Sequence, residues 1–131
     1  MRYYWMGLRR PFEDYMQNVF GWANTESMKN EMPTRSLEDI QVGDVWIYDA
    51  KSRPEARYGH AILVADVAKN PMTGEIAILL LQGSTPACSI HILNNTISPA
   101  DSPWFIIDQQ ADTLDFGMAK YHRDDLYRFA N

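Results

Sequence analysis

Residues 59–81 constrain the fold more than any other part of the chain. Two apolar runs, 59–67 and 76–81, are separated by the sequence Asn70-Pro71-Met72-Thr73-Gly74. Asparagine, proline and glycine favour a tight reversal of the backbone, so the two runs predict an antiparallel hairpin. Residues 59–67 are apolar on both faces toward the middle, which is typical of a buried strand.

Helices are predicted before this hairpin. Pro11 begins a segment whose apolar residues are spaced by three, four and seven, and Gly21 ends it. A second, short helix is predicted from a Thr25 cap to Pro33.

Further short strands are predicted on both sides of the hairpin. They are expected at 45–48, 89–93 and 104–107, whereas 124–129 suits a brief helix and a strand equally. The order of helices first and strands later indicates an α+β protein. We expect a single domain over 1–131, with a helical part at about 11–32 and an antiparallel sheet part at about 40–131, because a chain of 131 residues with 46% hydrophobic content can form one core.

Charge and cysteine content limit the class of protein. A net charge of −5 argues against a partner that is a nucleic acid polymer, since backbone binding requires clustered lysine and arginine. A single cysteine forms no internal disulfide, which favours the reducing cytoplasm. No apolar stretch approaches the length of a membrane helix, and arginines follow the first residues where a signal peptide would be hydrophobic, so we expect a soluble protein without a membrane partner.

Gly43-Asp44-Val45 and Gly59-His60-Ala61 begin two of the predicted strands. This pair of motifs resembles the sheet of the papain-like NlpC-type hydrolases and CHAP amidases. The resemblance implies an N-terminal helix packed on an antiparallel half-barrel sheet, with His60 as a catalytic base. In those enzymes the nucleophilic cysteine precedes the histidine, and no cysteine precedes residue 58 here.

Cys88 is the remaining thiol and would be the nucleophile of a permuted version. It follows Pro86 and precedes a predicted strand, so no helix begins at it to favour a thiolate, and a small packed cysteine is the better interpretation. Ser84 is an alternative nucleophile, with Asp44 or Asp66 as the acid of a triad, although no nucleophile elbow surrounds it.

Polar residues gather at one end of the predicted hairpin. The end of its second strand lies beside the start of its first, so Gln82 and Ser84 should approach Tyr58 and His60. Such a cluster can form a pocket for a small polar ligand. We expect its lining to comprise Arg57, Tyr58, His60, Gln82, Ser84 and Trp104.

Aromatic side chains are candidates for the walls of the same pocket, and metal ligands are not expected there. Trp46, Phe105 and Trp104 suit either its walls or ordinary core packing. No metal site or cofactor is expected, because His60, His91 and His122 are scattered and lack paired acidic or thiol ligands.

A longer resemblance covers about residues 12–129. The segments 15–22, 40–46, 59–67, 80–93 and Ser102-Pro103-Trp104 are similar to the C-terminal half of the uncharacterised bacterial family called domain of unknown function 4846. The resemblance implies a bacterial or phage protein that lacks the family's N-terminal portion.

Three functions remain open on these observations. The first is non-catalytic binding or sequestration of a small polar ligand, either a nucleotide (a signalling nucleotide if the protein is viral) or a cell-wall fragment. The second is an NlpC-like hydrolase that uses His60 with Cys88 or Ser84. The third is a structural protein that forms a homo-oligomer through the aromatic N-terminus, Tyr3, Tyr4, Trp5 and Met6.

Overall fold

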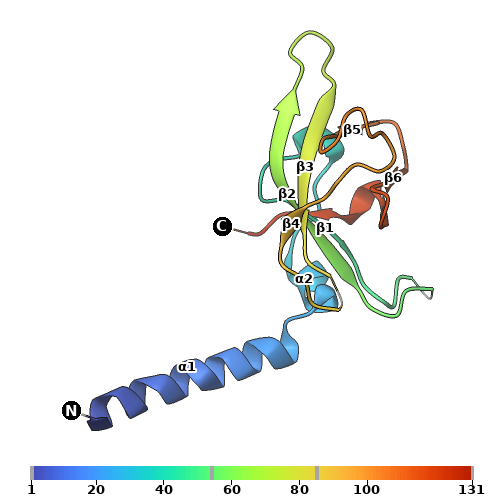
Figure 1. The fold of residues 1–131 in the computed structure, drawn as a ribbon. Helices are drawn as coiled ribbons and strands as arrows, with labels where there is room; N and C mark the ends of the chain where they lie inside the picture. The colour runs from blue at the N-terminus through green and yellow to red at the C-terminus, as the bar shows by residue number, and fades with distance from the viewer. Residues whose placement is uncertain (1, 54, 85, 131) are drawn as a thin grey trace.

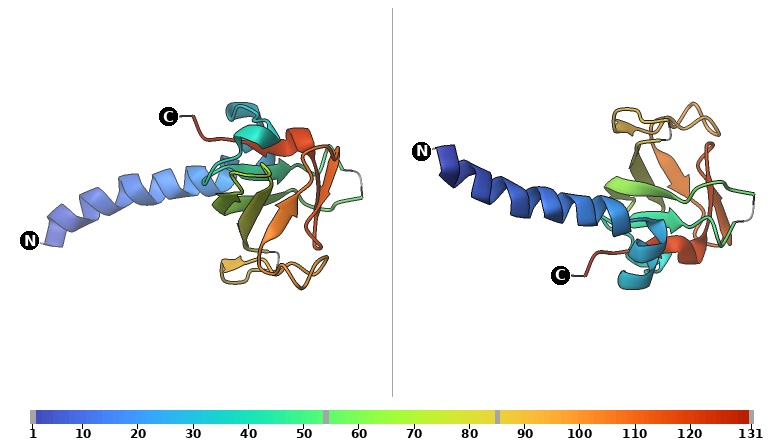
Figure 2. Two further views of the ribbon diagram at one scale, coloured as in Figure 1. Left: turned by 90° about the horizontal axis from the view of Figure 1, so that it is seen from above. Right: turned by 90° about the horizontal axis from the view of Figure 1, so that it is seen from below.

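The first helix extends away from the rest of the protein. The computed structural model describes residues 2–53, 55–84 and 86–130, with side chains from residue 11 onward. Helix α1 (Arg2–Trp22) projects from the sheet as a gently curved rod (Figures 1 and 2). The prediction that this helix begins at Pro11 is wrong, because Pro11 lies inside it. A proline inside a helix removes one backbone hydrogen bond but bends the helix rather than ending it when both flanks remain helical.

Helix α2 (Thr25–Glu31) is the helix that contacts the sheet, against strand β1. Its N-cap is Asn24, whose side chain accepts a hydrogen bond from the Ser27 backbone N–H at 3.0 Å, while Ser27 Oγ accepts from the Asn24 N–H. This reciprocal capping box fixes the start of the helix one residue before the predicted Thr25 cap.

The sheet is antiparallel and has the strand order β4-β3-β2-β1-β8, with β5 pairing to β3. A separate two-stranded sheet is formed by β6 and β7. The strands are β1 (Val45–Tyr48), β2 (His60–Lys69), β3 (Ile76–Gln82), β4 (His91–Ile92), β5 (Phe105–Ile107), β6 (Thr113–Asp115), β7 (Lys120–His122) and β8 (Leu126–Tyr127), and the 3-10 turns are Leu37–Asp39 and Arg123–Asp125. The α+β class is confirmed, and the relation to papain-like hydrolases stays a prediction.

The predicted hairpin is confirmed. Strands β2 and β3 pair antiparallel, with Leu63 opposite Leu81 and Lys69 opposite Ile76 (Figure 1). The register shifts between Val64 and Asp66, so Ala65 is an extra residue on β2, which is the signature of a β-bulge.

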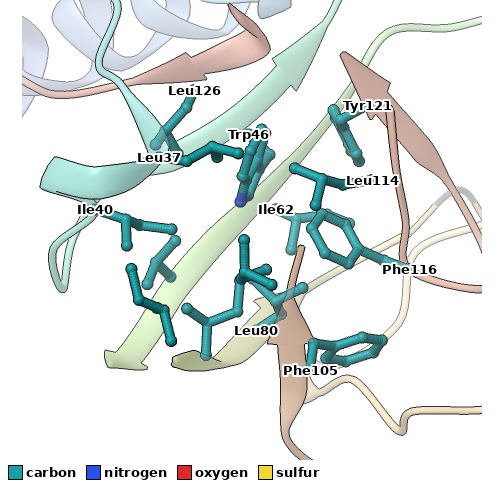
Figure 3. Packing of buried hydrophobic residues seen from close by; sticks show 14 of the residues in the cluster. Leu37, Ile40, Trp46, Ile62, Leu80, Phe105, Leu114, Phe116, Tyr121 and Leu126 are labelled. Carbon is teal, nitrogen blue, oxygen red and sulfur yellow. The ribbon is translucent and has the colours of Figure 1, made fainter. Parts of the chain in front are cut away.

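One face of the sheet carries the main core. Alternate residues of β3 are buried, and Trp46 of β1 and Ile62 of β2 are fully enclosed beneath the β6–β7 hairpin (Figure 3). The aromatic rings of Phe116 and Tyr121 pack on Trp46, with ring centroids 5.6 and 6.0 Å away. The opposite face is partly covered by α2, through a second cluster comprising Met32, Val45, Ile47 and Tyr127.

Candidate functional site

A histidine and a buried amide meet at the end of the β2–β3 hairpin. His60 is the first residue of β2 and Gln82 is the last of β3. The pairing of Leu63 with Leu81 places these two ends side by side. His60 Nε2 lies 2.9 Å from Gln82 Oε1, and Gln82 is only 3% exposed.

Gln82 also sets which nitrogen of His60 carries a proton. The Gln82 Nε2 group donates to Met118 Sδ at 3.2 Å, and a thioether sulfur can only accept. The amide oxygen therefore faces His60 and must receive a hydrogen bond from Nε2–H. In the neutral ring Nδ1 is then left as an acceptor, available to a ligand or to a proton.

A cavity of about 260 Å³ opens beside this pair. Its lining includes every residue predicted for the ligand pocket except Trp104. The full lining is Tyr48, Ala56, Arg57, Tyr58, Gly59, His60, Gln82, Ser84, Met118 and Ala119.

Two arginines stack on tyrosine rings at this cavity. The Arg57 guanidinium lies 5.2 Å from the centre of the Tyr58 ring, and that of Arg53 lies 4.3 Å from the Tyr48 ring. Arg53 also approaches a carboxylate of Asp125 at 3.7 Å. No ion pair among the described side chains includes Arg57. Its positive charge is therefore open to an anion.

Cys88 is exposed and contacts a different histidine. Its Sγ lies 3.2 Å from Ser84 Oγ and 3.9 Å from His91 Nδ1. His91 Nδ1 is 2.9 Å from the carbonyl oxygen of Ser89, so this nitrogen carries a proton and cannot take one from the thiol. Among the described residues no hydrogen bond joins His60 to Ser84 or Cys88, although Ser84 lines the same cavity.

Asp44 and Asp66, the acids proposed for a triad with Ser84 and His60, have other partners. Asp44 is fully buried and accepts two hydrogen bonds from Arg128, and Asp66 accepts one from the backbone N–H of Val67. Neither has a hydrogen bond or ion pair with His60 among the described residues, so the arrangement does not assemble a Ser84-His60-acid triad.

The tryptophans lie away from the cavity. Trp46 is fully buried in the core, and Phe105 is buried with it. Trp104 precedes β5, which pairs with Ile76–Ile78 at the opposite end of β3 from Gln82. Its backbone carbonyl accepts a hydrogen bond from the buried Asn95 side chain, a contact that orders the loop before β5.

Tyr48, Met118 and Ala119 line the cavity but were not predicted. Tyr48 pairs with His60 across β1 and β2, and their ring centroids are 6.3 Å apart. Its position as the last residue of a predicted strand was a usable signal. Met118 and Ala119 follow Gly117, whose φ of +83° marks the turn between β6 and β7. Gly117 is the sequence signal of this turn, although the three-residue strands on either side of it show no period.

The described part of the chain has no cluster of metal-ligating side chains and no helix suited to cross a membrane. There, no group of three or more histidine, cysteine or acidic side chains could hold a metal ion. None of the described helices combines the length and apolar character needed to cross a bilayer. The side chains of Tyr3, Tyr4, Trp5 and Met6 lie outside those described.

Comparison with known families gives one match over most of the chain. A family model described as "Domain of unknown function (4846)" matches residues 7–128. Comparisons with curated proteins and with solved structures found no match.

Proposed function

The chain belongs to the family described as domain of unknown function 4846, and from this premise we propose that it binds a small phosphate-bearing ligand, such as a nucleotide, in the cavity beside His60. The ligand is bound and not converted. The proposal does not depend on any activity of the family, whose description assigns none.

The unpaired Arg57 is the observation that carries this proposal. A guanidinium that lines a cavity and has no carboxylate partner among the described side chains is a ready site for a phosphate, since its planar donors match phosphate oxygens in pairs. By contrast Arg123 and Arg128 approach the carboxylates of Glu38 and Asp44.

Aromatic and polar groups of the cavity suit the rest of a nucleotide. The Tyr58 ring is exposed and can stack on a planar base. His60 Nδ1 offers an acceptor to an amino group, whereas the Gln82 amide is already occupied by His60 and Met118. Base selection would therefore depend on His60 and Ser84 more than on Gln82.

The available volume also suits a ligand of this size. A second hollow of about 290 Å³ shares Tyr48, Ala56, Met118 and Ala119 with the cavity, and the rest of its lining comprises Arg53, Glu55, Gly117 and Lys120. The two together fall within the roughly 300–1000 Å³ of typical small-molecule sites. The free thiol of Cys88 supports a location in the reducing cytoplasm, where such ligands occur.

Ligand retention tests the proposal. The purified protein is incubated with cyclic and linear nucleotides and muropeptides, separated, denatured, and the released molecules are identified by mass spectrometry. We expect an intact nucleotide to be enriched. His60→Ala and Arg57→Gln should each weaken its binding at least tenfold, and Cys88→Ala should leave it within twofold. Retention of no nucleotide at micromolar concentration, or the reverse pattern of variants, would contradict the proposal.

A hydrolase is the second candidate, and the orientation of His60 favours it. With Nε2–H held by Gln82, Nδ1 is the free acceptor that a general base requires. Ser84 is the serine hydroxyl of the same cavity, whose lining also has the phenols of Tyr48 and Tyr58. Altered molecules in the filtrate of the retention experiment would support this candidate. Loss of that conversion in Ser84→Ala would identify the nucleophile, and alkylation of Cys88 no faster than a free thiol would exclude the cysteine version.

A further inference from the structure

Helix α1 carries an apolar face that the described part of the chain leaves largely exposed. Phe20 and Trp22 are 73% and 78% exposed, and Phe12 and Tyr15 are exposed to a similar extent. At 3.6 residues per turn the apolar residues of 11–22 occupy about half of the circumference, and the polar residues occupy the other half. Helices in proteins gain most of their stability from the packing of an apolar face, so a face this exposed favours a partner surface.

An apolar hollow lies on the outer face of the sheet. It has a volume of about 340 Å³, and its lining is almost entirely carbon, including Leu63, Leu81, Ile90 and Phe129. The face opposite the main core is thus only partly covered, since α2 packs on the second cluster through Met28 and leaves the hollow open.

A groove connects this hollow to α1. The groove, of about 530 Å³, lies between the two helices and is lined by Tyr15, Val19 and Trp22 of α1 and by Met28 of α2. Met28 lines both the groove and the hollow, so the two are adjacent parts of the surface of this chain. Only Ala23 and Asn24 separate α1 from α2, so α1 forms one wall of this surface and leaves room for a second helix.

We infer that the α1 helix of a second copy of this chain occupies the groove and the outer hollow, and that the two copies exchange helices in a twofold-symmetric dimer. In such an isologous contact each helix fills the groove of the other copy, so both apolar surfaces of both copies are covered. Residues 11–22 span about 18 Å as a helix, enough to cross the groove and reach the hollow.

The area available is sufficient for a stable dimer. Four exposed aromatic side chains bury on the order of 150 Å² or more each, and a twofold contact uses the helices of both copies. Together with the surfaces that receive them, they reach the roughly 1200–2000 Å² of specific protein–protein interfaces. The ligand cavity lies on the core side of the sheet, and Gln82 lines both it and the outer hollow.

The mass of the protein in solution is the first test. We expect light scattering at micromolar concentration to give about 30 kDa, twice the 15.1 kDa of one chain. Val19→Glu in the helix and Leu63→Glu in the hollow should each give the mass of one chain with an unchanged near-ultraviolet spectrum. Gln17→Glu, on the polar face of α1, and Met72→Glu, in the exposed hairpin turn, are matched controls and should remain dimeric.

Disulfide cross-linking tests the helix exchange if a glutamate variant does not fold. In a Cys88→Ser background, Val19→Cys and Leu63→Cys chains are mixed and oxidised. A disulfide-linked species of two chains that contains both cysteines supports the exchange. A wild-type monomer, a dimer that survives either glutamate substitution, or the absence of a disulfide between the two different chains of the mixture would overturn it.

Discussion

Arg128 near the C-terminal end holds the buried carboxylate of Asp44 with two hydrogen bonds, from Nε at 2.6 Å and from Nη2 at 2.9 Å. The Asp44 carboxylate also accepts the backbone N–H of Gln41 at 2.9 Å, so the turn before β1 and the segment after β8 are joined at one side chain. This hydrogen bonding raises the pKa of Arg128 above its usual range. The pair therefore attaches the C-terminal strand to the sheet.

Removal of one partner should be strongly destabilising. Asp44→Ala leaves Arg128 without its buried partner and the Gln41 N–H without an acceptor, and we expect a loss of about 3–5 kcal/mol in the free energy of unfolding. Urea denaturation measures it. Glu38→Ala, which removes the partner of Arg123 at 3.6 Å at the surface, is the control and should cost less than about 1 kcal/mol. Equal losses in the two variants would contradict this role for Asp44.

Gln82→Leu should change the tautomer of neutral His60. Without the Gln82 oxygen, Nε2–H loses its acceptor, and the two neutral tautomers become mixed. Long-range proton–nitrogen spectra of the imidazole distinguish them. Met118→Leu removes the sulfur contact but keeps the Gln82 oxygen, so it should retain the Nε2–H form. A wild-type protein with Nδ1–H would show that the Gln82 amide has the opposite orientation.

Gly59→Ala should displace α2 from the sheet. A Cβ at Gly59 would lie 1.9 Å from Thr25 Oγ1 and 2.8 Å from the carbonyl oxygen of Tyr48. We expect a loss of about 1–3 kcal/mol, typical of overpacking, measured by thermal unfolding. Adding Thr25→Ala should restore only part of the lost stability, since the clash with the carbonyl oxygen of Tyr48 remains. Gly83→Ala, whose Cβ would have its nearest contact at 3.8 Å, should have little effect.

Acid should lower the free energy of unfolding of the protein because Asp49 becomes protonated. The hydrogen bond from Lys29, at 2.9 Å, and that from the Ser52 backbone lower the pKa of Asp49 from 3.8 to about 2. A carboxylate with a lower pKa in the folded state stabilises it fully above pH 3.8, and this contribution is lost as the pH falls toward 2. The difference in unfolding free energy between wild type and Asp49→Asn should therefore shrink from pH 5 to pH 2. A difference that is constant across this range would exclude the mechanism.

Local signals in the sequence were enough to predict the centre of the fold, strand β1 and the β2–β3 hairpin. The 45–48 strand agrees with β1 to the residue, and the 70–74 turn identified the β2–β3 pairing, which in turn brought Gln82 to His60. These features depend on alternation and on turn residues that lie close together in the chain, so a sequence reveals them.

Non-local features could not be predicted in the same way. Strands β6 and β7 have three residues each, too few to show a period, and the wall formed by Met118 was therefore missed. Trp104 was placed in the pocket because nothing local shows that β5 pairs with the far end of β3. Pro11 suggested a helix start because proline favours that position, but the helix continues on both sides of it.

The extra residue at Ala65 interrupts the regular pairing of the hairpin between its two ends. On one side of it the pairing of Leu63 with Leu81 fixes His60 against Gln82, and on the other side the strands run out to the exposed turn at Met72. Changes in the length of that turn would be absorbed beyond the bulge, without altering the register that aligns the cavity. The hairpin tip is therefore the part of this chain best suited to accept an inserted peptide tag or fluorescent reporter while the cavity keeps its shape.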